Sequence, residues 1–291
     1  MVMVNGLQPT KRDIRDFSYS QQFGSVSPLV LPKEFYVSQP LDIKQQYGSD
    51  FCIGFASAAV REFTEGVILD PFFVWSQMAK LRGDWREWGM DLRTAAKVLT
   101  KIGIVEQKDQ PYNLENKDRD FLANWENYPK ELENKASDHK AISYFWIDGP
   151  YDFFDNIRST LYLNKEEKRS VLVGAEWRPS WSSAIKGIVK TTDFSEMFFG
   201  HAFIFFGWKE IDNEPYLVAQ LSNGKEFGDS GIFYFSRSVV NSNAFRFSGL
   251  TFKDFNQEDY KKTQFTLIQR LYDLIKIYQQ LIKMKLGKVW G

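Results

Sequence analysis

Hydrophobic positions in the first half of the chain recur at helical spacing. In residues 52–65, CIGFASAAVREFTE, the apolar side chains of Phe55, Ala59 and Phe63 fall on one face, and a glycine follows. A second helix is predicted from Asp70, a capping residue followed by proline, through FFVWSQMAKL. A third covers DLRTAAKVLTKI and also ends at a glycine. The first half is therefore expected to be mainly helical.

The second half has a different pattern. SVLVGAEW, HAFIFFGW, PYLVAQL and GIFYFS are short β-branched and aromatic runs separated by turn-forming residues, which is typical of strands. The charged stretch 113–140 between the halves is expected to be a surface excursion. Helices followed by strands predict an α+β chain with a helical lobe at about 45–135 and a β lobe at about 140–250. A cleft is expected between the lobes.

Composition excludes several classes of function. The 37 basic and 37 acidic residues balance, so no global field attracts nucleic acid or an anionic membrane. One cysteine cannot form an internal disulfide, and the N-terminus lacks the apolar run of a signal peptide, which favours a cytoplasmic protein or one assembled there. No stretch is apolar enough for a transmembrane segment. Metal, phosphate-loop, dinucleotide and GxSxG motifs are missing, so no metal or cofactor is expected.

The single cysteine is the main chemical candidate. Cys52 stands at the start of a predicted helix, where unpaired N–H groups and the helix dipole stabilise a thiolate. The alternative is a buried structural thiol, the commoner use of a free cysteine. A nucleophilic thiolate needs an imidazole and an oxyanion donor, and His201 and Gln46 supply both types. His201 could equally be a core or edge residue of its strand, whereas His139, in the charged stretch, is expected to be solvated.

Three blocks together resemble one family. The run around Gln46 and Cys52, then GHAFIFFGW, then PYLVAQLSNGKEFGDSGIFYF, are similar in order and spacing to papain-like cysteine peptidases, and the middle of the chain resembles their bacterial and phage branch. The resemblance implies a papain-like two-lobe fold over residues 33–250, with a helical L lobe and a β-barrel-like R lobe. It implies that Cys52 is the nucleophile, His201 the general acid/base and Gln46 an oxyanion donor. It also places Gly89 and Met90 where the family binds the backbone of an extended peptide substrate.

The departures from the family pattern put activity in doubt. The family's KNSWG segment is QLSNG here, so Leu221 replaces the asparagine that orients the catalytic histidine. Asn223, two residues on and on the same face of an extended strand, is the candidate substitute, and Gln220 serves only if the register slips by one. Asparagine before glycine is also an ordinary turn residue. Asp50 puts a carboxylate near the thiol, which opposes thiolate formation.

Both ends of the chain extend beyond the resemblance. Residues 1–32 are predicted to be an extended arm, which could cover the cleft, although nothing in the sequence shows it. Residues 251–291 contain an amphipathic helix about 40 Å long, for which packing on its own domain, self-association or docking on a partner and, as a minor alternative, a membrane surface all stay open. Its apolar face carries Leu267, Leu271, Leu274, Tyr278 and Leu281.

Two hypotheses follow. One is a cysteine-type peptidase that acts on a peptide or protein substrate. The other is a weakened or inactive papain-fold structural protein in a larger assembly such as a phage particle or virion.

Overall fold

A computed structural model describes residues 5–10, 13, 16–110 and 118–254. Contacts group residues 1–253 into one compact unit, and a second unit begins at Asp254. The predicted amphipathic helix at 259–286 lies outside the described residues. Within the described part, no helix combines the length and apolarity that a bilayer crossing demands.

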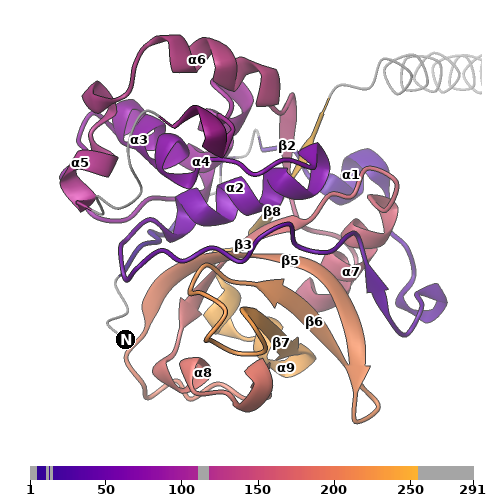
Figure 1. The fold of residues 1–291 in the computed structure, drawn as a ribbon. Helices are drawn as coiled ribbons and strands as arrows, with labels where there is room; N and C mark the ends of the chain where they lie inside the picture. Colours follow the sequence, from indigo (N-terminus) through magenta and orange to yellow (C-terminus); the bar gives the residue numbers. More distant parts are fainter. Residues whose placement is uncertain (1–4, 11–12, 14–15, 111–117, 255–291) are drawn as a thin grey trace, which may run out of the picture. The chain divides into compact units, whose positions relative to one another are not determined.

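The helices of the compact unit are concentrated in its first half, as the periodicity predicts (Figure 1). They are α1 (Tyr19–Phe23), α2 (Cys52–Glu65), α3 (Pro71–Arg82), α4 (Leu92–Lys101), α5 (Arg119–Ala123), α6 (Glu131–Ala136), α7 (Phe153–Leu163), α8 (Pro179–Ser182) and α9 (Arg237–Val240).

The ends of the main helices follow from local chemistry. The Asp70 carboxylate accepts the Phe72 N–H at the start of α3, and the Asp91 carboxylate caps α4 in the same way. Gly66 and Gly83 end α2 and α3 in the left-handed conformation that glycine adopts without steric cost. The three helices predicted from sequence are therefore confirmed to within about one residue.

The strands form one sheet in the order β2-β8-β3-β5-β6-β7-β4, with β1 paired to β5. Its members are β1 (Phe35–Tyr36), β2 (Ser143–Trp146), β3 (Val171–Trp177), β4 (Ile188–Val189), β5 (Phe199–Ile211), β6 (Glu214–Gln220), β7 (Ile232–Ser236) and β8 (Gly249–Lys253). The α+β class is confirmed. However, β2 and β4 do not pair with each other, so the described strands make an open sheet rather than the barrel-like lobe that the resemblance implied.

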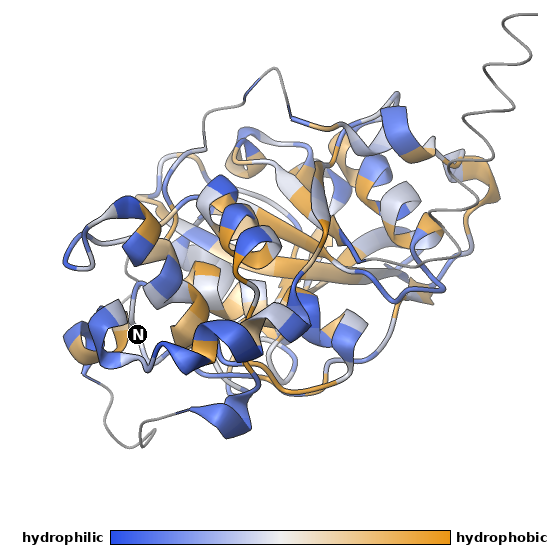
Figure 2. Ribbon diagram, turned by 90° about the horizontal axis from the view of Figure 1, so that it is seen from above, coloured by the Kyte–Doolittle hydropathy of each residue, from blue (hydrophilic) through white to orange (hydrophobic). Residues whose placement is uncertain are grey.

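Helix α2 is the central packing element. It contacts α3 on one side and β5 on the other, and Figure 1 shows it lying along β3 and β5. Its residues from Cys52 to Phe63 are all buried, which is why the segment is apolar almost all round. In Figure 2 the central strands are largely orange, while blue residues line the outer helices and loops.

The charged stretch 113–140 is not a simple surface excursion where it is described. Tyr128 packs its ring edge-to-face against Phe73 of α3, and Leu132 is buried in the same small apolar cluster. His139 is also not solvated as expected, because its side chain is only 17% exposed and Nδ1 lies 3.2 Å from a Glu65 carboxylate oxygen. The many charged residues of this segment obscure the few apolar side chains, such as Tyr128 and Leu132, that pack it against the helices.

Candidate active site

Cys52 is the first residue of α2 and is completely buried. The preceding residue, Phe51, supplies no side-chain cap. The first N–H groups of the helix, at the end that carries the thiol, are therefore not satisfied by a capping side chain. Burial nevertheless raises the pKa of the thiol to about 12, and the negative charge of Asp50 adds to this effect. A hydrogen bond from the Ala202 N–H to the sulfur acts in the opposite direction. In this closed state the thiol is protonated at neutral pH.

His201 lies on β5, directly before the residue that bonds the thiol, and pairs in register with Ala175 of β3. The ring is 2% exposed, and burial lowers its pKa to about 4. Trp177 of β3 covers the ring edge-to-face at 5.4 Å between centroids. The structure thus brings the strand of the predicted histidine against the helix end that carries the cysteine, although 149 positions separate them.

Asn223 is the side chain that reaches the imidazole. Nε2 of His201 has no partner of good hydrogen-bond geometry, but the Asn223 side chain lies close enough to the ring to raise its pKa against the effect of burial. Asn223 is 3% exposed, and Gln45 Nε2 fixes its backbone by donating to its carbonyl at 2.9 Å.

The other two candidates for this role lie elsewhere. Leu221 borders a small void together with Phe55 and Ala59 of α2, so it packs between the helix and the sheet. Gln220 donates through Nε2 to the Asp42 carbonyl at 2.8 Å.

Gln46 is held rigidly next to the cysteine loop. Its Oε1 accepts from Ser222 Oγ at 2.6 Å, its Nε2 donates to the Ser49 carbonyl at 2.8 Å, and its backbone N–H donates to the Ser222 carbonyl. The side chain is therefore tied both to the turn before Cys52 and to the segment before Asn223. The structure brings the four catalytic candidates, Cys52, His201, Gln46 and Asn223, to one region.

The N-terminal arm occupies the space in front of the thiol. The backbone of residues 6–8 pairs with Met90 in parallel, through Met90 N–H to the Gly6 carbonyl and Gln8 N–H to the Met90 carbonyl. On its other side the arm meets β5, because the N–H groups of Gly6 and Leu7 both donate to the Gly200 carbonyl. The sequence alone does not place the arm, and the structure shows it running between Met90 and β5.

Gly6 is the residue of the arm that touches the thiol. A β-carbon at this position would lie 2.6 Å from Cys52 Sγ and 2.7 Å from the Asp50 carbonyl oxygen, so only glycine allows the approach. Leu7, 1% exposed, fills the space over Gly174, where its Cδ2 would stand 2.4 Å from a β-carbon. The one sequence signal for this contact is a glycine–leucine pair directly before the polar run QPTKRD.

A buried thiol at a helix start, an imidazole on the strand against it and an amide beside the imidazole are the residue types that a cysteine protease requires. The chain belongs to the papain family of cysteine proteases, since the family model matches residues 88–247. This match includes His201 and Asn223 and begins after Cys52. No curated protein sequence matches the chain.

Solved structures show the same fold. Xylellain, a cysteine protease from Xylella fastidiosa, is 18% identical with a TM-score of 0.72, covering 88% of this chain and 97% of its own. Procathepsin L2 from the larval midgut of Tenebrio molitor is 15% identical with a TM-score of 0.65, covering 87% and 79%. The bromelain protease from Ananas comosus, in complex with the E64 inhibitor, is 14% identical with a TM-score of 0.57, covering 77% and 100%.

Proposed function

We propose that the chain is an active cysteine-type peptidase whose cleft is covered by its own N-terminal arm. The observation that carries this proposal is the meeting of the α2 N-terminus with β5, where the Ala202 N–H bonds the Cys52 sulfur and the Asn223 side chain lies against His201. A purely structural cysteine needs no imidazole held by a second polar side chain.

In the proposed reaction, the arm leaves and water reaches the pair, so that the pKa of His201 rises and that of Cys52 falls toward their ordinary ranges. The thiol proton passes to the imidazole, and the thiolate forms an S–C bond with the peptide carbonyl carbon. The C–N bond breaks as His201 protonates the leaving amine. Water, deprotonated by His201, then attacks the thioester and releases the acid, which restores the thiol.

Two donors are available to the oxyanion. We assign the backbone N–H of Cys52 at the helix start and the second Nε2 hydrogen of Gln46, whose first goes to Ser49. Because Oε1 of Gln46 accepts from Ser222, the orientation of the amide is fixed with nitrogen toward the cysteine loop. The Nε2 hydrogen of Gln46 would therefore donate to the oxyanion of both tetrahedral intermediates, the one of acylation and the one of deacylation.

We assign substrate backbone binding to Met90, beside Gly89, whose own N–H and carbonyl are taken by Asp50 and Arg82. Both backbone groups of Met90 already pair with an extended segment, residues 6–8 of the arm. The edge is thus competent to hold an extended peptide once the arm has left. Asn223 is assigned the orienting role that Leu221 cannot fill.

The test is the pH dependence of Cys52 alkylation by iodoacetamide, with a peptide-cleavage assay beside it, in the full chain and in a variant with a displaced arm, Leu7→Asp. Fast labelling at pH 6 that is lost in His201→Ala supports the pair. His139→Ala is the matched control, since it removes the only other histidine. Labelling that rises only above pH 8 in every variant, with no cleavage, would instead support an inactive papain-fold scaffold.

A further inference from the structure

Asp50 is an unusual neighbour for a nucleophilic thiol. It precedes Cys52 by two residues, and its carboxylate is completely buried. One oxygen accepts the Gly89 N–H at 2.9 Å. A buried carboxylate without a cation would cost several kcal/mol, so the residue that compensates it decides whether this site can exist.

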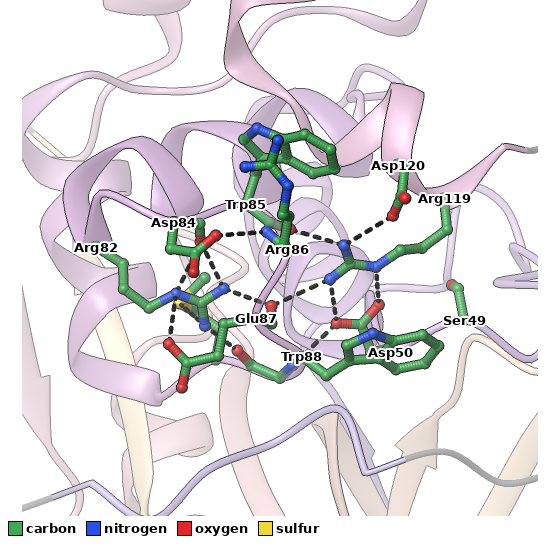
Figure 3. A network of polar contacts seen from close by, with 12 residues as sticks. Ser49, Asp50, Arg82, Asp84, Trp85, Arg86, Glu87, Trp88, Arg119 and Asp120 are labelled. Atoms are coloured by element: carbon green, nitrogen blue, oxygen red, sulfur yellow. Dashed lines mark hydrogen bonds and ion pairs between the residues drawn. The ribbon is translucent and has the colours of Figure 1, made fainter.

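Arg119, the first residue of α5, is that cation. Its Nε and Nη2 each lie 3.1 Å from a different oxygen of Asp50, which makes a two-pronged ion pair (Figure 3). The guanidinium also packs over the Trp75 ring at 4.9 Å and the Trp88 ring at 5.1 Å. Two indole rings and a buried carboxylate therefore fix its plane.

The remaining donors of Arg119 hold the segment that leads to Gly89. Nη1 donates to the Trp85 carbonyl at 2.7 Å, and Nη2 to the Glu87 carbonyl at 3.1 Å. Arg82, at the end of α3, holds the same segment, because its guanidinium donates to the carbonyls of Glu87 and Gly89. Figure 3 shows the two guanidinium groups on either side of this segment.

We propose that Arg119 is a positioning residue for this site: through Asp50 it holds the Gly89–Met90 edge against the cysteine loop, and it neutralises the carboxylate beside the thiol. The inference rests on the proposed peptidase function. It assigns Arg119 two separable effects, one on the geometry of substrate binding and one on the charge that Cys52 experiences.

The charged groups around this pair limit what can compensate for a lost Arg119. Arg82 also feels the charge of Asp50, but its own partner is Glu87 at 3.4 Å. Asp120 stands beside Arg119, and His201 lies on β5, the strand that bonds the other side of the arm. Removing Arg119 thus leaves Asp50 without its bidentate partner, and no second cation makes that contact in the described residues.

The experiment compares three full-chain variants, all in the Leu7→Asp background that opens the cleft. Arg119→Met removes charge and donors, Arg119→Lys keeps the charge without the fork, and Asp50→Asn with Arg119→Met removes both charges while an amide oxygen can still accept from Gly89. Each is measured for peptide-cleavage kinetics and for the pH midpoint of Cys52 alkylation. The alkylation arm requires no turnover, so it tests the charge effect even if no peptide is cleaved.

Arg119→Met is expected to lower kcat/KM on the order of 10- to 100-fold and to move the alkylation midpoint upward by about one pH unit. Arg119→Lys should keep the midpoint and raise KM. The double variant should return the midpoint to that of the background while KM stays raised. A merely structural arginine would lower the unfolding midpoint in urea without moving the alkylation profile.

Two results would overturn the inference: an Arg119→Met profile that superimposes on the background, or a double variant that keeps the full shift. Failure of the proposed function has a different signature, because His201→Ala would then leave the alkylation profile of the background unchanged whatever stands at position 119.

Discussion

The arm makes the strongest prediction, because a single buried leucine anchors it next to the thiol. Leu7 is 1% exposed, and its replacement by aspartate removes an apolar anchor and places a carboxyl group over Gly174. We expect Leu7→Asp to open the arm and to expose Cys52 to small electrophiles.

The magnitude follows from two costs. Losing the burial of a leucine side chain costs about 2 kcal/mol. Keeping an aspartate there at pH 7 requires either a buried charge or protonation, and protonation alone costs about 4 kcal/mol from a pKa near 3.9. Even the second cost alone lowers the equilibrium constant for closing on the order of 10³-fold, so the open fraction should rise by up to the same factor.

The assay is the second-order rate of iodoacetamide labelling of Cys52 at fixed pH, read by intact mass. Since this is the only cysteine, every added group reports on the site. Leu29→Asp is the matched control, because Leu29 is 94% exposed in the same N-terminal region and should change nothing. A labelling rate in Leu7→Asp within about threefold of the parent, which is about half of one tenfold step in free energy, would refute the idea that Leu7 anchors the arm over the thiol.

Three further predictions concern the site itself. Asn223→Leu should lower kcat on the order of 10- to 100-fold by removing the contact that orients His201. Leu221→Asn should restore nothing and cost about 1–3 kcal/mol in urea unfolding, because it buries an amide against α2. Gln46→Ala should lower kcat on the order of 10²-fold at nearly constant KM in steady-state kinetics, because this donor acts mainly in the transition state. A rise in KM alone would contradict this role. Burial lowers the pKa of His201 to about 4, so as the pH falls below 6.5 the unfolded chain takes up a proton at this histidine before the folded chain does. The free energy of unfolding should therefore fall by about 3 kcal/mol between pH 6.5 and 4. In urea unfolding, His201→Gln should show a shallower fall over this range, and a pH profile equal to that of the parent would contradict the prediction.

Sequence patterns predicted the parts of the fold that local chemistry determines. Helix α3 follows from Asp70 and the proline after it, and its end from Gly83, because each of these residues acts within a few positions. The strands of the second half also appear where β-branched and aromatic runs stand. Strand β5 continues to Ile211, beyond the predicted run, because pairing with β6 stabilises polar residues that have no strand pattern of their own.

The site was predictable as residue types and not as contacts. Cys52, His201 and Gln46 could be named from motif order, whereas the choice between Leu221 and Asn223 depended on which of the two side chains faces the histidine. The ion pair of Asp50 could not be predicted, because its partner, Arg119, lies 69 positions away among many other charged residues. Long-range polar contacts of this kind leave no periodic trace in the sequence.

The closed arm also has a consequence for the chemical lifetime of the protein. Oxidation of a cysteine to the sulfenic and higher acids requires a thiolate that peroxide can reach. Under the arm, Cys52 has no exposed surface and a pKa of about 12, so it meets neither condition. The arm at Gly6 therefore protects the thiol from oxidation. The covered protein should remain active after exposure to peroxide that would inactivate the same chain with its arm displaced.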